Sequence, residues 1–561
     1  TRQSKPGAIK SSATDHQELE WQFDVDDLEP VEGWLGQHFS GLGVFPEDTV
    51  ENTDTYYDTD DWRFYRAGYA MRVRKTNDGV EATMKSLSPA EGGLRRRREI
   101  SEPLKDDRPA TLRKARGPVG KRLKVLLGGR EINPLFQVQT RRQRFALLLK
   151  NSNDGDLEDV RIGEVALDSS EFGDEPERLK RVEVEAVGGT SPDLHGFVDE
   201  MQFALELAPA TISKYGTGLL ASGLNPDGGE SFGKTDVDPS MSVGEVAFAV
   251  LRRQFVEMRN HEPGTRLGED PEELHDMRVP TRRMRAAMKV FQDALPERAR
   301  WLREELRWVA HALGDVRDLD VQIERFQAWK EEADEESAEF LDRILKITEK
   351  RRVEARKNML DVLESGRYER LESSFAEMLR RGPEEELAQS NGHDPAREKI
   401  TAAAPPLVSR RYRTWRKAAK RLDENSSPEA FHDVRKKGKR LRYTLEFVSE
   451  VYGKPVQRLV KPLKALQDDL GDHQDAVVTA GFLRELGTKT DGTRVPRGAA
   501  FTMGVYSERC TREAADLRSS VPRSKPFRAL TKGKRWKRFE RIMQEARKNP
   551  NVAEPSSKSV R

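Results

Sequence analysis

The sequence predicts an α+β protein of several domains, in which an N-terminal antiparallel β domain precedes an all-α domain with two similar halves. The first observation is a series of short segments between about residues 18 and 187 in which apolar and polar residues alternate. The second is a set of long segments with helical spacing that reaches to about residue 528, and the third is a duplication within them. Because the chain has 561 residues, it is too long for a single hydrophobic core.

Composition indicates a heavily charged chain with no predicted membrane segment. Charged residues make up 35% of the sequence and mean hydropathy is −0.78. No apolar run approaches the roughly 20 residues that a spanning helix needs, and the first residues lack the apolar core of a secretory signal, so we expect a cytoplasmic location. A single cysteine excludes an internal disulfide framework and a Cys-rich zinc site.

Composition and residue patterning along the chain predict five parts. They are a disordered tail at 1–15, the β domain at 16–220, a Gly-, Ser-, Pro- and Asp-rich linker at 221–240, the helical domain at 241–528, and a basic tail at 529–561. In the last part, aromatic residues interleave with basic ones. We expect a solvated terminal helix there in preference to a contact with nucleic acid or polyphosphate.

Alternation in the β domain places like polar residues on one strand face. Glu18, Glu20 and Gln22 share a face, as do Arg72 with Arg74, Thr83 with Lys85, and Glu183 with Glu185. Such faces suit either a half-exposed sheet in water or a barrel whose interior holds a charged ligand. The residue types favour the second, because carboxylates suit Mg²⁺ or Mn²⁺ while Arg and Lys suit phosphate oxygens.

The helical domain repeats two motifs at one offset. The segment from Leu274 to Phe291 matches that from Phe431 to Val448, and LGDVRDLDV at Leu313 matches LGDHQDAVV at Leu470, each 157 residues later. In both copies an apolar stripe lies beside a basic stripe. The basic stripes comprise His275, Arg278, Arg282, Arg285 and Lys289, and His432, Arg435, Lys439 and Arg442, with Lys436, Lys437 and Arg440 beside them.

Like charges on one helical stripe repel each other, so their presence in both copies favours an anionic partner over a solvated face. Nucleic acid is the weaker alternative, since readers of bases usually interleave aromatic residues for stacking. The two histidines could also be ordinary histidines at the edge of the core.

The duplicated HDMRVPTRRMR and HDVRKKGKRLR segments with their paired LGD motifs resemble the CHAD family over about residues 241–528. This resemblance implies two similar helical halves and inorganic polyphosphate as the ligand. By it, the polyphosphate-binding residues are His275, Arg278, Arg282, Arg283, Arg285, His432, Arg435, Lys439, Arg440 and Arg442.

The β domain resembles the CYTH family of triphosphate tunnel metalloenzymes over about residues 16–220. The segments that carry the resemblance are, in order, ELEWQF, YYDT, MRVR, TMK, RREIS, TRRQR, GEVALD, RVEVEA and SKYG. It implies an eight-stranded tunnel that binds or hydrolyses triphosphate with Mg²⁺ or Mn²⁺. By this resemblance, the catalytic residues are Glu18, Glu20 and Lys85, and the metal-binding residues are Glu18, Glu20, Glu183 and Glu185. The substrate-binding residues are Arg72, Arg74, Arg142, Arg144 and Lys214. Which arginine of TRRQR points inward stays open.

One departure affects the predicted activity. Where the family's opening motif has Lys, this chain has Gln22. Losing one preorganised electrostatic contact can cost on the order of 10²- to 10³-fold in rate, whereas a glutamine can still donate a hydrogen bond. The sequence therefore favours a metal-dependent triphosphatase coupled to a polyphosphate-binding domain. The alternative is a non-catalytic polyphosphate-binding protein, with adenylate cyclase activity and nucleic-acid binding ranked lower.

Overall fold

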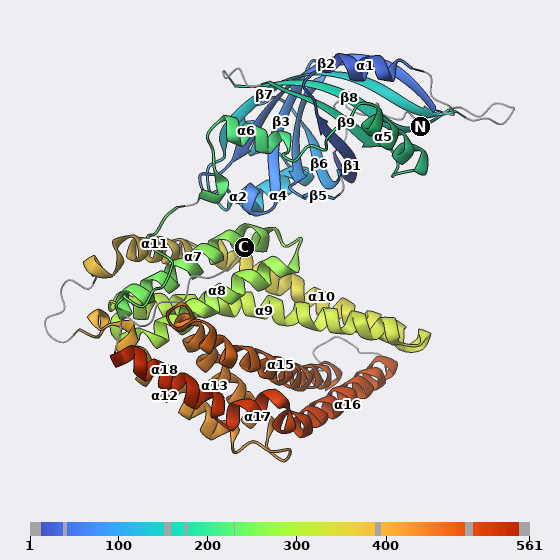
Figure 1. Ribbon diagram of the computed structural model, residues 1–561. Coiled ribbons are helices and arrows are strands. Elements are labelled where there is room, and N and C mark those ends of the chain that lie inside the picture. The colour runs from blue at the N-terminus through green and yellow to red at the C-terminus, as the bar shows by residue number, and fades with distance from the viewer. Residues whose placement is uncertain are drawn as a thin grey trace. The chain divides into compact units, whose positions relative to one another are not determined.

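The computed structural model describes residues 13–37, 42–91, 93–150, 159–173, 178–228, 230–386, 394–488 and 497–548 (Figure 1). The chain divides into two compact units. The first takes in residues up to 230 together with 263–270, and the second takes in 231–262 and 271 onward. No helix of the described residues is long and apolar enough to cross a membrane.

The first unit is a closed antiparallel barrel. Its strands are β1 (Thr14–Asp24), β2 (Leu42–Asp58), β3 (Tyr69–Thr76), β4 (Gly79–Ser86), β5 (Ala90–Glu91), β6 (Leu94–Leu104), β7 (Asn133–Leu149), β8 (Val160–Phe172) and β9 (Arg178–Ala186). Their order is β1-β9-β8-β7-β2-β3-β4-β6, and β1 also pairs with β6, so the eight long strands close into a ring while β5 is appended to β6. This confirms the predicted eight-stranded tunnel.

Alternation along the strands explains the barrel's two sides. On β1, for example, the aromatic Trp21 and Phe23 are buried in an outer apolar cluster with Trp34 of α1 and Phe197 of α5. The helices of this unit are α1 (Glu29–Leu35), α2 (Arg63–Arg66), α3 (Pro109–Leu112), α4 (Pro118–Leu127), α5 (Pro192–Ala204) and α6 (Lys214–Ala221). Because the apolar residues pack outward against these helices, the polar residues of the same strands face the interior.

The second unit is helical, and its elements repeat as the sequence predicted. They are α7 (Val243–Leu267), α8 (Pro271–Val290), α9 (Arg298–Glu332), α10 (Glu335–Leu363), α11 (Gly366–Glu386), α12 (Ile400–Ala419), α13 (Pro428–Phe447), α14 (Ser449–Tyr452), α15 (Lys454–Thr488), α16 (Arg497–Ser520), α17 (Lys525–Thr531) and α18 (Lys534–Lys548). The starts of α7 and α12, and of α8 and α13, are each 157 residues apart, the same offset as the motifs.

Two apolar cores hold the helical unit together. The larger core takes the apolar stripes of α8 and α13, including Met277, Met284, Phe431 and Leu441. A smaller core lies where α9, α10, α15 and α16 meet, around Phe326. The apolar stripes predicted from the sequence are therefore core, which leaves the basic stripes beside them for another role.

The predicted tail and linker differ from the structure in three places. Strand β1 begins at Thr14, two residues before the predicted domain start, while residues 1–12 lie outside the described residues. The predicted basic tail at 529–561 is wrong over α18, which buries Trp536 and Phe539 in the larger core because its aromatic residues fall on one helical face, while residues 549–561 lie outside the described residues. Within the predicted linker, Phe232 is buried in the same core, so the helical unit begins before residue 241.

Candidate functional site

The interior of the barrel is a polar cavity of about 130 Å³. Six cationic side chains and six carboxylates face it, contributed by most of the strands around the ring and by α6. The lining residues are His16, Glu18, Gln22, Tyr56, Ala70, Arg72, Arg74, Glu81, Lys85, Ser86, Leu87, Arg97, Glu99, Arg142, Glu164, Glu183, Glu185, Ser213, Lys214 and Tyr215. Most of the residues predicted for the tunnel therefore share one cavity.

Lys85 of β4 lies among three carboxylates. Its ammonium group pairs with Glu18 and lies 3.6 Å from a carboxylate oxygen of Glu99 and 3.7 Å from one of Glu20. Burial lowers the pKa of Lys85, but the negative charges of Glu18 and Glu99 outweigh it and hold that pKa above its usual value. Glu20 lies behind the cavity lining, buried and paired with Arg97.

Asp54 orients the two arginines of β3. The fully buried Asp54 accepts hydrogen bonds of 2.7 and 2.8 Å from Arg74, and Arg72 lies 3.5 Å from the same carboxylate. Burial raises the pKa of Asp54, but Arg74 and Arg72 more than offset this and hold it well below its usual range. The carboxylate is therefore charged and fixes both guanidinium groups toward the cavity.

Asp168 of β8 has the same role on the other side. Arg142 donates two hydrogen bonds of 2.7 Å to it, Lys214 donates another of 2.7 Å, and Arg142 also pairs with Glu183. Lys214 is placed by the first turn of α6, where the side chain of Ser213 caps the helix by accepting from the backbone N–H of Gly216. The late SKYG motif thus acts as a helix start that aims a lysine into the barrel.

Glu185 differs from the other interior carboxylates. It is not ion-paired with any residue that the structure describes, and burial followed by repulsion from Glu18 and Glu99 raises its pKa to about 8. Oxygen donors of this kind fit Mg²⁺ or Mn²⁺, whose charge would relieve the repulsion. Among the described residues, however, no three acidic, His or Cys groups stand close enough together to hold a metal ion. The metal set of Glu18, Glu20, Glu183 and Glu185 therefore stays a prediction.

Gln22 is buried in the cavity wall and forms hydrogen bonds at both ends of its amide. Its amide nitrogen donates to Glu183 over 3.1 Å, and its amide oxygen accepts from Arg181 over 3.5 Å. A neutral side chain therefore bridges an anion and a cation where the family pattern would place a positive charge.

Arg144 was predicted as a substrate contact, and it does not line the cavity. It lies on the same face of β7 as Arg142, but its guanidinium group is 3.8 Å from Asp48. Asp54, Asp168 and Arg97 were absent from the predicted set. Period-two alternation could have found them, since Asp54 precedes Tyr56 by two residues and Asp168 follows Glu164 by four.

In the helical unit, α8 and α13 bring five of the predicted basic residues together, and we call this set the inner basic cluster. It comprises Arg278, Arg282, Arg435, Lys439 and Arg442. Burial and then the charges of these four arginines lower the pKa of Lys439 to about 7. The guanidinium groups of Arg282 and Arg442 lie 5.9 and 5.2 Å from the ring centre of the buried Tyr443.

The glycines of the paired LGD motifs lie against this cluster. The position that a Cβ would take on Gly314 lies 3.6 Å from a guanidinium nitrogen of Arg278, and the equivalent distance from Gly471 to Arg435 is 3.4 Å. Both pairs are related by the 157-residue offset. A Cβ at these distances would make an ordinary van der Waals contact, so each glycine marks the place where one arginine packs against the neighbouring helix.

The other predicted residues of the basic stripes lie elsewhere. Arg283 pairs with Glu446 over 2.7 Å, whereas Arg285 lies near Arg303 and Arg307 of α9, and Arg440 near Arg411 of α12. His275 and His432 are half-buried, and Nδ1 of His432 has no hydrogen-bond partner among the described residues.

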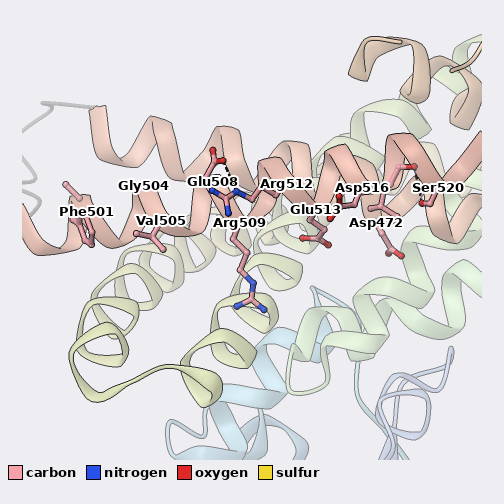
Figure 2. Close-up of a pocket in the computed structure, with 12 residues that line it drawn as sticks. Asp472, Phe501, Gly504, Val505, Glu508, Arg509, Arg512, Glu513, Asp516 and Ser520 are labelled. Carbon is pink, nitrogen blue, oxygen red and sulfur yellow. Dashed lines mark hydrogen bonds and ion pairs between the residues drawn. The ribbon is translucent and has the colours of Figure 1, made fainter. Parts of the chain in front are cut away.

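A separate hollow of about 1050 Å³ runs along α16 (Figure 2). Phe501 and Val505 lie at one end, and Glu508, Arg509 and Arg512 project from the middle of the helix. None of the predicted site residues lines it, and its charges are of both signs. It therefore lacks the cationic excess that a phosphate site requires.

Two family models match the chain. Residues 30–217 match the model of the CYTH domain, and residues 249–484 match that of the CHAD domain. Two uncharacterized proteins of Mycobacterium tuberculosis, from strains CDC 1551 and H37Rv, are each 31% identical over 224 residues. The match covers 37% of this chain and spans only 39% of the length of these relatives.

Solved structures are similar to each part. A CHAD domain from the plant Ricinus communis is 25% identical, covers 54% of this chain and 97% of its own, and has a TM-score of 0.43. A Hippeastrum protein, named an adenylyl cyclase with a dominant triphosphatase activity, is 17% identical with a TM-score of 0.27 and covers 37% and 97% of the two chains. TM-scores below 0.5 establish no function for this chain.

Proposed function

We propose that this chain, which carries a CYTH domain followed by a CHAD domain, is a metal-dependent triphosphate hydrolase whose helical unit binds polyphosphate. The observation that supports the hydrolase is the charge-balanced interior of the closed barrel. Arg72, Arg74, Arg142 and Lys214 face it from several strands and α6, and buried aspartates fix their orientation. Such preorganised cations are what the phosphates of a linear triphosphate require.

Substrate entry would redistribute the interior ion pairs. A phosphate chain offers oxygens to Arg142 and Lys85, which are now held by Glu183 and Glu18. The released carboxylates and Glu185 are the oxygen donors that would hold Mg²⁺ or Mn²⁺, and Glu20 would join them only by leaving its pair with Arg97. When bound, such a cation neutralises phosphate charge and lowers the pKa of a coordinated water.

The chain's own residues bind and orient the substrate. Arg72 and Arg74 hold one part of the phosphate chain while Arg142 and Lys214 hold another, and the barrel wall limits the access of bulk water. In hydrolysis, the oxygen of one water molecule bonds to the terminal phosphorus as the phosphoanhydride bond breaks. The electron pair stays on the leaving diphosphate, and the protons of the water are released with the products.

The test is release of phosphate from inorganic triphosphate with and without Mg²⁺ or Mn²⁺, in wild type and in Glu185→Gln. Glu185 is chosen because it is not ion-paired with any described residue, so the amide should preserve the fold. The matched control is Glu171→Gln, since Glu171 lies on β8 outside the cavity. We expect metal-dependent release that falls at least about tenfold in Glu185→Gln and is unchanged in the control. Equal activity in both variants would count against a metal role for Glu185.

A second function, binding without turnover, is favoured by one observation. Gln22 is neutral and hydrogen-bonded between Glu183 and Arg181, where a lysine would add a phosphate contact. If wild type releases no phosphate and Gln22→Lys does, the barrel is a binding module. If wild type is active, the hydrolase proposal holds despite Gln22.

The inner basic cluster supports polyphosphate binding by the helical unit. Burial and mutual repulsion keep Lys439 partly uncharged, so an anion that neutralises the arginines relieves the repulsion. We expect Arg282→Gln with Lys439→Gln to weaken binding of labelled polyphosphate. The control is Lys436→Gln with Lys437→Gln, on the same helix as Lys439, where Lys437 pairs with Asp433. Equal binding by both double variants would contradict the proposed role.

A further inference from the structure

Helix α18 has an apolar inner face and a basic outer face. Trp536 stacks on Tyr412 of α12 at 4.0 Å between ring centres, and Phe539 meets the ring of Tyr452 edge-on at 5.6 Å. These contacts fix the helix against the core and turn the opposite side to solvent. On that side the exposed residues are Lys534, Arg535, Lys537, Arg538 and Arg541.

A second basic stripe adjoins this side. Arg535 donates a hydrogen bond of 3.1 Å to the backbone carbonyl of Arg458 on α15, which brings the two helices side by side at this point. Lys454, Arg458 and Lys461 are exposed on α15 at helical spacing. We call the combined set the outer basic face: Lys454, Arg458, Lys461, Lys534, Arg535, Lys537, Arg538 and Arg541.

The protein compensates only a small part of the charge of the outer basic face. Residues 525–548 contain ten basic and two acidic residues, a net charge of +8 in a chain whose total is +2. No carboxylate of the described residues lies within ion-pair distance of any member. Some exposed arginines elsewhere are paired along their helices, as in Arg343 with Glu339 at 2.6 Å and Arg512 with Glu508 at 3.1 Å.

The concentration of positive charge on this one face indicates the chemistry of a partner. Unpaired like charges at helical spacing repel each other, so the face is stabilised by a ligand that brings many negative charges. The aromatic residues of α18 are buried 94% or more and cannot stack on bases, which favours a ligand that offers phosphates alone.

We propose that the outer basic face is a second binding site for a linear inorganic phosphate polymer, composed of residues that the inner basic cluster does not share. The identification of the ligand as polyphosphate rests on the function proposed above, whereas the location of the binding site on this face does not. Helix α18 lies outside residues 249–484, which match the CHAD model, so the site extends beyond the part that defines the family.

The experiment measures binding of fluorescently labelled long-chain polyphosphate to the full chain at several salt concentrations. The test variant carries Lys534→Gln, Lys537→Gln, Arg538→Gln and Arg541→Gln, which keep helix propensity and leave the buried face intact. The control removes the same charge at paired positions: Arg343→Gln, Arg381→Gln, Arg397→Gln and Arg512→Gln. We expect the slope of log affinity against log salt to fall by about 3 in the test variant, and less in the control.

The outcomes separate this site from the inner basic cluster. If the test variant binds polyphosphate like the control, while Arg282→Gln with Lys439→Gln weakens binding, the outer site is refuted and the proposed function stands. If the inner variant has no effect and the outer variant does, the outer site stands and the inner assignment falls. If the outer variant loses affinity only for RNA of equal charge, the face serves nucleic acid and the proposal is wrong.

Discussion

The pKa of Lys439 predicts that polyphosphate binding depends on pH. In the free protein, burial and the four neighbouring arginines lower this pKa from 10.5 to about 7. Asp475 of α15 also interacts with Lys439 and Arg435, but burial raises its own pKa, so it supplies only part of the compensating charge. Bound phosphates favour the charged amine and return its pKa toward the usual value.

The magnitude follows from this difference. Below pH 7 the amine is charged in both states, so Lys439 adds no pH dependence there. Between pH 7 and the higher pKa of the complex, each pH unit lowers affinity by up to about tenfold, or about 100-fold from pH 7 to pH 9. Binding in this window should take up one proton.

The assay is titration of the full chain with long-chain polyphosphate by calorimetry in buffers of different ionisation enthalpy, at pH 6, 7, 8 and 9. Long chains keep the titration of terminal phosphates small. Lys439→Arg keeps its charge across this range and should bind with a nearly flat pH profile, while Lys439→Gln should bind more weakly and also without the slope. A wild-type affinity that is the same at pH 7 and pH 9 would refute the reasoning, because Lys439 would then be charged in the free protein.

Three further predictions concern stability. Because the pKa of Glu185 is raised from 4.5 to about 8, the contribution of this group to stability should fall as pH rises from 4.5 to 8. Glu185→Gln should therefore gain in melting temperature relative to wild type across that window, and a constant difference between the two would contradict the shift. Trp536→Ala removes the stack on Tyr412 and should lower the free energy of unfolding by about 3–5 kcal/mol in urea, whereas a loss under about 1 kcal/mol would mean that α18 is not part of the core. Asp54→Asn leaves the charge of Arg74 unbalanced and should lower the free energy of unfolding by about 3 kcal/mol in urea. A free energy of unfolding equal to that of wild type would contradict this role of Asp54.

Much of the candidate barrel site was predictable from residue types alone. Alternation placed Glu18, Arg72, Lys85 and Glu183 on single strand faces, and the structure brings all four to one cavity. Arg144 obeys the same alternation and still does not line the cavity, although it lies only two residues from Arg142 on β7. Alternation assigns a face, but it does not give the position along the barrel axis.

The basic stripes show a similar division. Helical spacing predicted that Arg278 and Arg282 share a side of α8, and the duplication predicted the matching side of α13. Spacing could not show that Arg283 would pair with Glu446 or that Arg285 would lie near α9, since both depend on which helix packs beside α8. In the same way, the sequence of α18 showed its amphipathic pattern but not whether a core was available to receive Trp536.

The sequence by itself determined the class of each unit, the duplication and the types of charge, because periodicity and residue chemistry are local properties. Only the tertiary structure decided which charges meet. Burial raises the pKa of Glu185, and Glu18 and Glu99, brought beside it from other strands, raise it further. Burial lowers the pKa of Lys439, and the arginines that meet where α8 packs against α13 lower it further. Electrostatic effects of this kind depend on distance and burial, and the chain acquires both only when its elements close around a common interior.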